Sequence, residues 1–395
     1  VVEGRRKKAR RRAVGPFSFD VDGKAYHPGN PLVIAEIGTG HGGDPVKASE
    51  LLHAAREAGA GCAKFQHLYA REIIHPETGM VPLPGGPVSL FDRFVSLETG
   101  PDFFASLKEQ AEALGLLFLC TPFGVRSARE LAEIGVRAVK VASPELNHHE
   151  LLDEIARMAV PAILSSGVST LGDIERAVDR LRPEAGHGPS LALLHCVTAY
   201  PAPEEDYNLR ILEPLSTLLG LAVGVSDHSR DPVLVPALSV CAGASIVEKH
   251  ICLSRSDPGL DDPIALPPAD FRSMTSAIRT AARDPRAARE ALEREHGRDK
   301  VDAVLGDGRK RLAPSEKANY GRTNRSLHAL RPISKGEVFT REYVAALRTE
   351  KVLRPGLGPE FLEVILGRRA ARDVPDGEGI EWGDVGGQWT VDSGR

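Results

Sequence analysis

Charged and hydroxyl-bearing side chains stand at the ends of apolar runs throughout the first 250 residues of the chain. Lys64 and Lys140 each lie close to the end of such a run. Ammonium groups supply positive charge and hydroxyls supply directional hydrogen bonds, so together they favour a pocket for a phosphate or a carboxylate. The hydroxyl groups belong to Thr121, Ser143, Ser165 and Ser226.

Two histidines, His228 and His250, end consecutive apolar runs. Their imidazoles, together with a carboxylate from Glu36, Asp227 or Asp261, would hold a divalent cation such as Mn²⁺ with open coordination positions. The spacings HxxxH and CxxC are absent around them. A pair of hydrogen-bonded structural histidines therefore remains an alternative.

Three classes of function fit these residue types. A metal-assisted enzyme that forms carbon–carbon bonds would use the imidazoles to bind a cation that polarises a carbonyl. A Schiff-base aldolase would use Lys64 or Lys140 as a buried nucleophilic amine. A non-catalytic sugar-binding barrel would use the charged pocket only as a receptor. The residue types alone leave all three open.

The elements that carry these residues predict an α/β protein built on a (β/α)8 TIM barrel. Eight apolar runs alternate with segments of helical periodicity, such as residues 44–60 and 101–115. An open doubly wound sheet is the alternative, but "EIGTGHGGD" lacks the GxGxxG spacing expected after its first strand. The predicted strands are residues 32–38, 62–66, 116–123, 138–143, 161–168, 191–197, 221–227 and 244–251.

The composition and the residue patterns of the sequence divide the chain into four parts. Residues 1–30 are a basic tail and lead-in, and residues 31–284 form the predicted catalytic barrel. Residues 285–322 are rich in charge and predict a linker with some helix. Residues 323–395 predict a small, mostly β domain with a C-terminal tail, because short strand patterns alternate with Gly/Pro turns.

Composition and charge predict a cytoplasmic protein that binds small molecules. The net charge of −4 argues against general nucleic-acid binding, despite the basic run "RRKKARRR" at residues 5–12. The five single cysteines predict reduced thiols. No apolar run approaches the ~20 residues of a membrane helix, so no membrane partner is expected.

The order of the motifs, from about residue 31 to residue 385, resembles the N-acetylneuraminate (sialic acid) synthase family. The matching stretches include "AGAGCAKFQ", "VKVASPELNHHELL", "LLHCVTAYPAPEEDYNLRIL", "VGVSDHS", "GASIVEKHICL" and "LRPGLG". The resemblance implies a (β/α)8 barrel followed by an antifreeze-like SAF domain of β-clip type. It also implies a domain-swapped homodimer that joins phosphoenolpyruvate to an N-acyl hexosamine such as N-acetylmannosamine, giving a nine-carbon 2-keto acid and phosphate.

The resemblance also implies roles for individual residues. His228 and His250 would ligate Mn²⁺, with Mg²⁺ or Co²⁺ as alternatives, and Glu36 would be the catalytic carboxylate beside the metal. Arg354 would enter the partner subunit's site to hold the N-acyl group. Phosphoenolpyruvate would bind to Lys64, Thr121, Lys140, Ser143, Ser165 and Ser226, and the sugar to Gln66, Glu145, Tyr200, Asp261 and Arg354. In this picture the lysines are anion ligands rather than Schiff-base nucleophiles.

Four positions depart from the family pattern: Gly40, Thr198, Asp262 and Ala265. We expect them to affect the choice of acceptor more than the phosphoenolpyruvate chemistry. The same chemistry on a 2,4-diacetamido-trideoxyhexose, as in legionaminic acid synthesis, or on a sugar of a spore-coat polysaccharide pathway is therefore an alternative.

Overall fold

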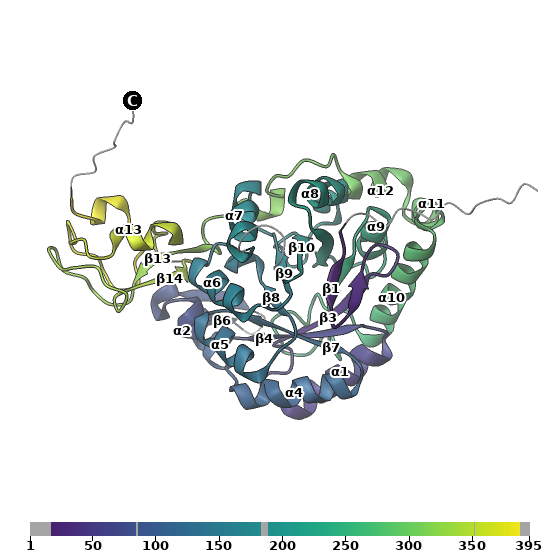
Figure 1. Cartoon of the computed structure of the whole chain (residues 1–395), viewed down its shortest axis with the longest axis horizontal. Helices are drawn as coiled ribbons and strands as arrows, with labels where there is room; N and C mark the ends of the chain where they lie inside the picture. Colours follow the sequence, from purple (N-terminus) through teal and green to yellow (C-terminus); the bar gives the residue numbers. More distant parts are fainter. Residues whose placement is uncertain (1–16, 84–85, 183–188, 351, 388–395) are drawn as a thin grey trace, which may run out of the picture.

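The main body of the protein is a closed barrel of eight parallel strands (Figure 1). The computed structural model describes residues 17–83, 86–182, 189–350 and 352–387. Every barrel strand coincides with a predicted apolar run, so the predicted barrel is confirmed and the open sheet is excluded. In ring order from β3 the strands are β3 (Leu32–Gly38), β4 (Cys62–His67), β7 (Leu117–Pro122), β8 (Val139–Val141), β9 (Ala162–Ser165), β10 (Leu191–Cys196), β11 (Ala222–Asp227) and β12 (Ile246–His250).

Helices between the strands form the outer layer of the barrel. The first begins where the sequence predicts, because the Asp44 side chain accepts a hydrogen bond from the Val46 amide (2.8 Å) and Pro45 needs no partner for its nitrogen. The helices are α1 (Pro45–Glu57), α4 (Pro101–Ala113), α5 (Val125–Ile134), α6 (His149–Met158), α7 (Leu171–Leu181), α8 (Leu212–Leu219), α9 (Leu234–Cys241) and α10 (Pro268–Arg283).

Side chains alternate between the two faces of each strand, so one hydrophobic core lies between the barrel and its helices and a second fills the barrel interior. On β3, Ala35 and Ile37 pack against the helices, whereas Leu32 and Ile34 fill the barrel interior. The next inward position is the buried Glu36. Six of the other seven strands repeat this change from apolar to polar along the inward positions, two or four residues apart, and β10 does not. The pairs are Cys62 and Lys64, Leu119 and Thr121, Ala138 and Lys140, Ile163 and Ser165, Ala222 and Ser226, and Ile246 and Glu248.

A short hairpin of β1 (Phe19–Val21) and β2 (Lys24–Tyr26) covers the other end of the barrel. Phe19 and Val21 are buried in the same cluster as the residues at the strand starts. The amino end is therefore closed by apolar packing, which leaves the carboxyl end for a site. The basic run at residues 5–12 lies outside the described residues.

Two segments outside the regular barrel also border its carboxyl end. After β4 the chain forms α2 (Ala70–Ile73), η1 (Pro76–Thr78), β5 (Met80–Leu83), β6 (Gly86–Ser89) and α3 (Leu90–Val95). After α10, in the predicted linker, α11 (Pro285–His296) and α12 (Arg298–Leu305) bury Leu292 and Val301 in the main core. The linker then returns through η5 (Pro314–Glu316).

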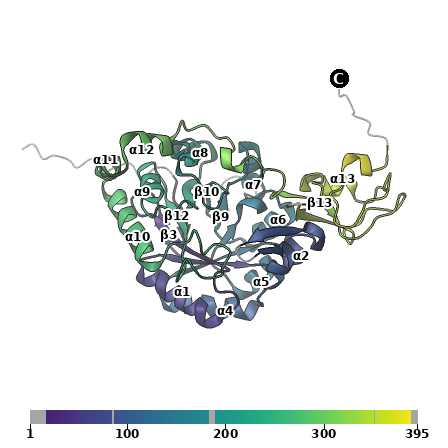
Figure 2. The ribbon, with the colours of Figure 1, turned by 180° about the vertical axis from the view of Figure 1, so that it is seen from behind.

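The C-terminal domain lies to one side of the barrel, beside α2 and α6 (Figures 1 and 2). It has its own core around Leu327, Phe339 and Ile380, separate from the two cores of the barrel. Its elements are the antiparallel strands β13 (Arg325–Ala329) and β14 (Val344–Arg348), with η6 (Pro359–Phe361), α13 (Leu362–Ile365) and η7 (Trp382–Asp384). Among the described residues, no helix is both long and apolar enough to span a bilayer.

Candidate active site

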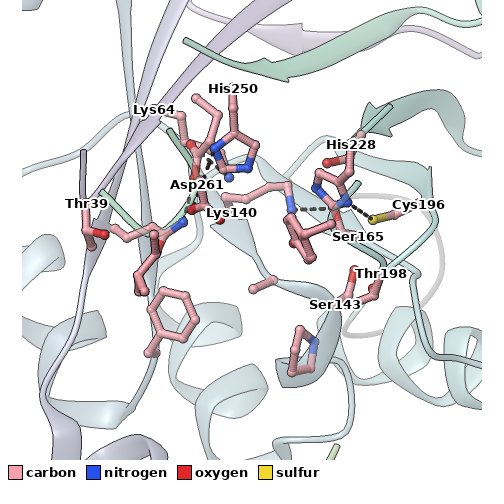
Figure 3. Close-up of a pocket in the computed structure, with 18 of the residues that line it drawn as sticks. Thr39, Lys64, Lys140, Ser143, Ser165, Cys196, Thr198, His228, His250 and Asp261 are labelled. Carbon is pink, nitrogen blue, oxygen red and sulfur yellow. Dashed lines mark hydrogen bonds and ion pairs between the residues drawn. The ribbon is translucent and has the colours of Figure 1, made fainter. Parts of the chain in front are cut away.

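A pocket opens at the carboxyl end of the barrel, and most of the predicted site residues line it (Figure 3). We call the part that barrel strands form around Lys64 and Lys140 the cationic end, after its two ammonium groups, and the part that loops and the C-terminal domain contribute, with Tyr200, Asp261 and Arg348, the rim end. The predicted site residues in the lining are Glu36, Lys64, Gln66, Lys140, Ser143, Ser165, Tyr200, Ser226, His228, His250 and Asp261.

At the cationic end, Lys64 is held between two buried carboxylates. Its Nζ lies 3.1 Å from Glu36 Oε2 and 3.3 Å from Glu248 Oε1. Burial alone would lower the pKa of Lys64, but Glu248 and Glu36 outweigh burial and raise this pKa. Gln66 Nε2 donates to the other oxygen of Glu36 (2.7 Å). Lys64 is therefore a fixed, permanently charged group.

Lys140 differs from Lys64 in its partners, which are hydrogen-bond acceptors rather than carboxylates. Its Nζ donates to Ser165 Oγ (2.6 Å) and to the Val141 carbonyl (2.9 Å), and within the described chain no carboxylate lies at ion-pair distance from it. Burial lowers the pKa of Lys140 to about 8, with the more distant Glu248 opposing. A bound anion would supply the missing counter-charge, so this lysine favours an anionic ligand.

Hydroxyls around the lysines include two without hydrogen-bond partners. Ser226 Oγ donates to Glu248 Oε1 (2.9 Å), and Ser143 Oγ accepts from the Gly167 amide (3.0 Å). The buried Oγ1 atoms of Thr121 and Thr198 have no partner in the described part of the chain. Because an unpaired buried hydroxyl is unfavourable, a ligand oxygen is a fitting partner for each.

The imidazoles of His228 and His250 face one another, with ring centroids 5.7 Å apart. His228 Nδ1 donates to the Val197 carbonyl (2.8 Å), which leaves the lone pair on Nε2. Burial lowers the pKa of both histidines, so both are neutral. Two neutral imidazoles, one with its tautomer fixed by a backbone carbonyl, suit a divalent transition metal.

The protein supplies few further ligands for such a metal. The nearest carboxylate to His250 is Asp261, whose Oδ2 lies 3.8 Å from Nδ1. Over the described ranges, no group of three or more His, Cys, Asp or Glu side chains is arranged to hold a metal ion. The donor set therefore fits a cation held by two imidazoles whose other positions are open to water or substrate.

Comparison with family profiles shows to which family the chain belongs. The profile of the NeuB family matches residues 51–286, and that of the SAF domain matches residues 324–386. The chain belongs to the NeuB family. The C-terminal domain is an SAF domain, as the resemblance implied.

Relatives of this NeuB-family chain include a spore coat polysaccharide biosynthesis protein and a legionaminic acid synthase. Spore coat polysaccharide biosynthesis protein SpsE of Bacillus subtilis is 32% identical, covering 93% of this chain and 97% of that protein. Its crystal structure superposes with a TM-score of 0.77 at 31% identity over 94% of this chain and 99% of the other. N,N'-diacetyllegionaminic acid synthase of Legionella pneumophila is 31% identical, covering 89% and 93%.

A sialic acid synthase is also similar. The crystal structure of N-acetylneuraminic acid synthetase from Leptospira borgpetersenii has a TM-score of 0.60 and 28% identity, over 76% of this chain and 94% of that chain. The relatives therefore include both sialic and legionaminic acid synthases, which are enzymes.

Three of the predicted site residues lie outside the pocket lining. Thr121 is buried on β7 at an inward position, with its side chain next to the cationic end. Glu145 is buried beneath the SAF domain, where Arg325 and Arg348 occupy its carboxylate. Arg354 binds Gly379, Glu378 and Asp384 within its own domain. The sugar-binding roles of Glu145 and Arg354 stay predictions.

Strand parity explains which polar strand ends reach the pocket. Glu248 points inward and lines it, whereas the adjacent Lys249 points outward and pairs with Asp227 at 2.6 Å. His195 is also turned outward, and its Nε2 donates to the Tyr207 carbonyl (2.6 Å). Because Asp227 pairs with the outward-pointing Lys249, it lies on the helix side of the barrel wall and faces away from the two imidazoles. Reading every second residue of each run would have separated Glu248 from Lys249.

Of the four departures from the NeuB pattern, only Thr198 lines the pocket. Asp262 accepts a hydrogen bond from the Gly259 amide (2.8 Å), and Gly40 approaches the Ile37 carbonyl so closely that a Cβ would lie 3.0 Å from its oxygen. Ala265 is buried. Thr198 is thus the departure that a ligand would contact.

One residue that the sequence did not suggest is Glu316 of the linker. Its buried carboxylate accepts hydrogen bonds from the amides of Val168 (2.8 Å) and Thr198 (2.7 Å), which follow β9 and β10. Gly167 lies beside this contact, where a Cβ would be 2.1 Å from Thr198 Oγ1. The linker therefore holds two loops of the pocket in place. Nothing in a charge-rich segment marks one glutamate among many as buried.

Proposed function

We propose that this NeuB-family chain is a nonulosonate synthase that condenses phosphoenolpyruvate with an N-acylated hexosamine. The observation that carries the proposal is that one pocket contains two lysines and two facing imidazoles. Lys64 is paired with carboxylates, and Lys140 is held only by hydrogen bonds. Phosphoenolpyruvate has two anionic groups, and the cationic end offers two ammonium groups for them. The names of the relatives support the same reaction class.

The chain's own residues would bind and orient phosphoenolpyruvate. Lys64 and Lys140 would each hold one of its anionic groups, with the hydroxyls of Ser143, Ser165 and Ser226 directing the oxygens. The barrel wall excludes water from the buried side of this end, which strengthens each contact. Carbon 3 of phosphoenolpyruvate then attacks the aldehyde carbon of the open-chain sugar. Water adds at carbon 2, and phosphate leaves.

His228 and His250 would hold a divalent metal, Mn²⁺ by preference and Mg²⁺ or Co²⁺ as alternatives. A metal bound there supplies Lewis-acid polarisation of the sugar's carbonyl. Glu36 pairs with Lys64 and is the register partner of His250 on the neighbouring strand, and it would hold the water that adds to carbon 2 and take up its proton.

Several sugars are candidates for the acceptor substrate. N-acetylmannosamine is one candidate, and a 2,4-diacetamido-trideoxyhexose or a sugar of a spore-coat polysaccharide pathway are the others. The similarity to SpsE and to legionaminic acid synthases favours keeping all of them in the test. Thr198, which departs from the family pattern inside the pocket, is one reason to expect a distinct preference.

The deciding experiment is release of phosphate from phosphoenolpyruvate over a panel of N-acyl hexosamines, with and without EDTA. We expect release with at least one sugar, loss of release in EDTA and recovery with Mn²⁺. No release with any sugar at any metal concentration would overturn the proposal.

The lowered pKa of Lys140 favours one competing function, a Schiff-base aldolase, because a buried amine with a pKa of about 8 is a competent nucleophile. The same assay separates the two. Full turnover in EDTA together with inactivation by borohydride in the presence of the carbonyl substrate would support the aldolase. A saturable sugar complex with no product by mass spectrometry would instead support a binding barrel.

We further propose that the protein acts as a domain-swapped homodimer in which Arg354 enters the partner's pocket. Arg354 is about one-third exposed and lies outside the pocket of its own chain, which supports this role. Mixing Arg354→Ala with His228→Ala tests it, because a mixed dimer would contain one intact composite site. Two inactive homodimers that regain activity on mixing are expected. No recovery in a mixture shown to exchange subunits would contradict the swap.

A further inference from the structure

The loop that follows β9, residues 166–169, has a strained backbone. Val168 is fully buried and has a φ of 43°, in the left-handed region that a β-branched residue adopts only under strain. Such a conformation persists where surrounding contacts hold it, and such residues cluster at functional sites. The contacts that hold this loop, and the pocket residues that it touches, are therefore informative about function.

Two side chains of the linker hold the backbone of this loop, on either side of Gly167. Glu316 Oε1 accepts a hydrogen bond from the Val168 amide (2.8 Å), and Lys310 Nζ donates to the Ser166 carbonyl (3.1 Å). Burial lowers the pKa of Lys310, and the nearby Glu316 carboxylate opposes this shift. Both linker residues precede the SAF domain, so these contacts do not depend on which barrel that domain covers.

Glu316 also joins this loop to the loop after β10. The same oxygen, Oε1, accepts from the Thr198 amide (2.7 Å), and Oε2 accepts from the Ala313 amide of the linker (3.2 Å). Hydrogen bonds from amides to a carboxylate are charge-assisted, which makes them stronger than those between neutral groups. A neutral side chain of the same size would therefore hold the two loops less firmly.

The loop contacts the cationic end through Gly167 and its neighbour. Ser165, directly before the loop, accepts from Lys140 Nζ (2.6 Å). The Gly167 amide donates to Ser143 Oγ (3.0 Å), so the hydroxyl hydrogen of Ser143 is directed away from the loop. A Cβ on Gly167 would lie 3.0 Å from Ser143 Oγ and 2.1 Å from Thr198 Oγ1, two groups that lie side by side in the pocket (Figure 3). The position of the loop therefore sets the position of a hydroxyl donor at the cationic end.

We propose that Glu316 is a positioning residue for phosphoenolpyruvate. Through the loop after β9 it holds the Ser143 hydroxyl where an anionic oxygen of this substrate accepts its hydrogen bond. The inference rests on the proposed function and extends its machinery from the barrel to the linker. Glu316 is not in the pocket lining, so its effect passes through Gly167 to Ser143 rather than through contact with the substrate.

The test compares Glu316→Gln with wild type. The Kd of phosphoenolpyruvate is measured by calorimetry without acceptor, and both KM values are measured by phosphate release. Glutamine keeps the size of the side chain but removes its charge and one of its two acceptor atoms. We expect the Kd and KM of phosphoenolpyruvate to rise by about tenfold, as for a weakened hydrogen bond to an anion. The acceptor KM should rise by less than about threefold.

Asp206→Asn is the matched control, because Asp206 also holds the linker with a carboxylate but does not contact the pocket loops. Its Oδ2 accepts from the amide (3.1 Å) and the hydroxyl (2.6 Å) of Ser315, the residue before Glu316. This substitution should leave the Kd of phosphoenolpyruvate within about twofold of wild type. The control therefore separates looser docking of the linker from loss of the loop contact.

A double-mutant cycle tests the route through Ser143. Ser143→Ala alone removes the hydroxyl donor and should raise the Kd of phosphoenolpyruvate by about tenfold. In the Glu316→Gln background the same substitution should raise it by less than about threefold, because the hydroxyl is already displaced. A purely structural role for Glu316 would instead give additive effects.

Three results would overturn the inference without affecting the proposed function. They are an unchanged Kd in a folded Glu316→Gln protein, an equal rise in the acceptor KM, and additive effects in the cycle. A loss of affinity in Asp206→Asn as large as that in Glu316→Gln would also overturn it, because docking of the whole linker would then be responsible. Wild-type protein that neither binds phosphoenolpyruvate nor releases phosphate with any acceptor would overturn the proposed function itself.

Discussion

The cationic end and the rim end of the pocket are built in different ways. At the cationic end, Lys64, Lys140 and Glu248 come from barrel strands and are buried. At the rim end, Tyr200 is 52% exposed, and Arg348 comes from another domain. Under the proposed function, rigid strands would hold phosphoenolpyruvate, the constant substrate, whereas loops and a domain contact would select the acceptor.

The largest expected effect comes from breaking the ion pairs at the cationic end. Lys64→Met leaves Glu36 and Glu248 buried without a counter-charge. We expect turnover to fall by about a hundredfold to a thousandfold and the free energy of unfolding to fall by about 3–5 kcal/mol. Phosphate release and urea unfolding measure the two effects.

Lys140→Met is the matched comparison, because Lys140 has hydrogen bonds but no carboxylate at ion-pair distance in the described chain. Turnover should fall as strongly, while the free energy of unfolding should change by less than about 1 kcal/mol. Equal destabilisation by both substitutions would show that the pairs around Lys64 do not set the stability of this end.

The second prediction uses pH to separate the two lysines. Lys140, with its pKa lowered to about 8, binds an anion only when protonated, whereas Lys64 keeps its proton because its pKa is raised. KM for phosphoenolpyruvate should therefore be constant below about pH 7 and rise toward about tenfold per pH unit above pH 8. In Lys140→Arg, whose guanidinium stays protonated, this alkaline rise should disappear. A rise that persists in Lys140→Arg would assign it to another group.

A third and smaller effect is expected at the rim end. Asp261 is partly exposed and contacts His250, so Asp261→Asn should raise KM for the acceptor by about tenfold and leave KM for phosphoenolpyruvate within about twofold. Asp257→Asn, in the same loop but paired with Lys47, is the control. If Asp261→Asn weakens both substrates equally, the division of the pocket into two ends is wrong.

The smallest effect is expected at Thr198, which lines the pocket. Thr198→Val replaces a buried hydroxyl that has no partner in the described chain by a methyl group of similar size. We expect KM for one substrate to rise by less than about tenfold, with unchanged or slightly greater thermal stability. Which of the two KM values changes tells which end the hydroxyl serves, and a marked loss of stability would mean that it has a structural partner.

The barrel was predictable because each strand is covered on both faces. Runs such as residues 191–197 are apolar except for His195, and a parallel sheet covered on both faces buries such runs. The polar ends of the runs then had to gather at the carboxyl end, so the grouping of Lys64, Lys140 and His250 followed from the sequence. Their inward or outward direction was also available from strand parity, which separates Glu248 from Lys249.

Contacts between distant segments were not predictable in this way. Glu145 has the motif context of a sugar-binding residue, yet Arg325 and Arg348, 180 and 203 residues later, occupy both of its oxygens. Glu316 looks like any charge of a linker, although it binds two pocket loops.

The sequence by itself determined the strands, the inward polar positions and the residue types of the cationic end. The reason is that hydrophobic burial and strand alternation act over a few neighbouring residues. Only the tertiary structure decided which carboxylate each cation meets, and that Arg348 rather than Glu145 faces the pocket. Such pairings depend on desolvation and distance between groups that are far apart in the chain, and both exist only once the domains are packed together.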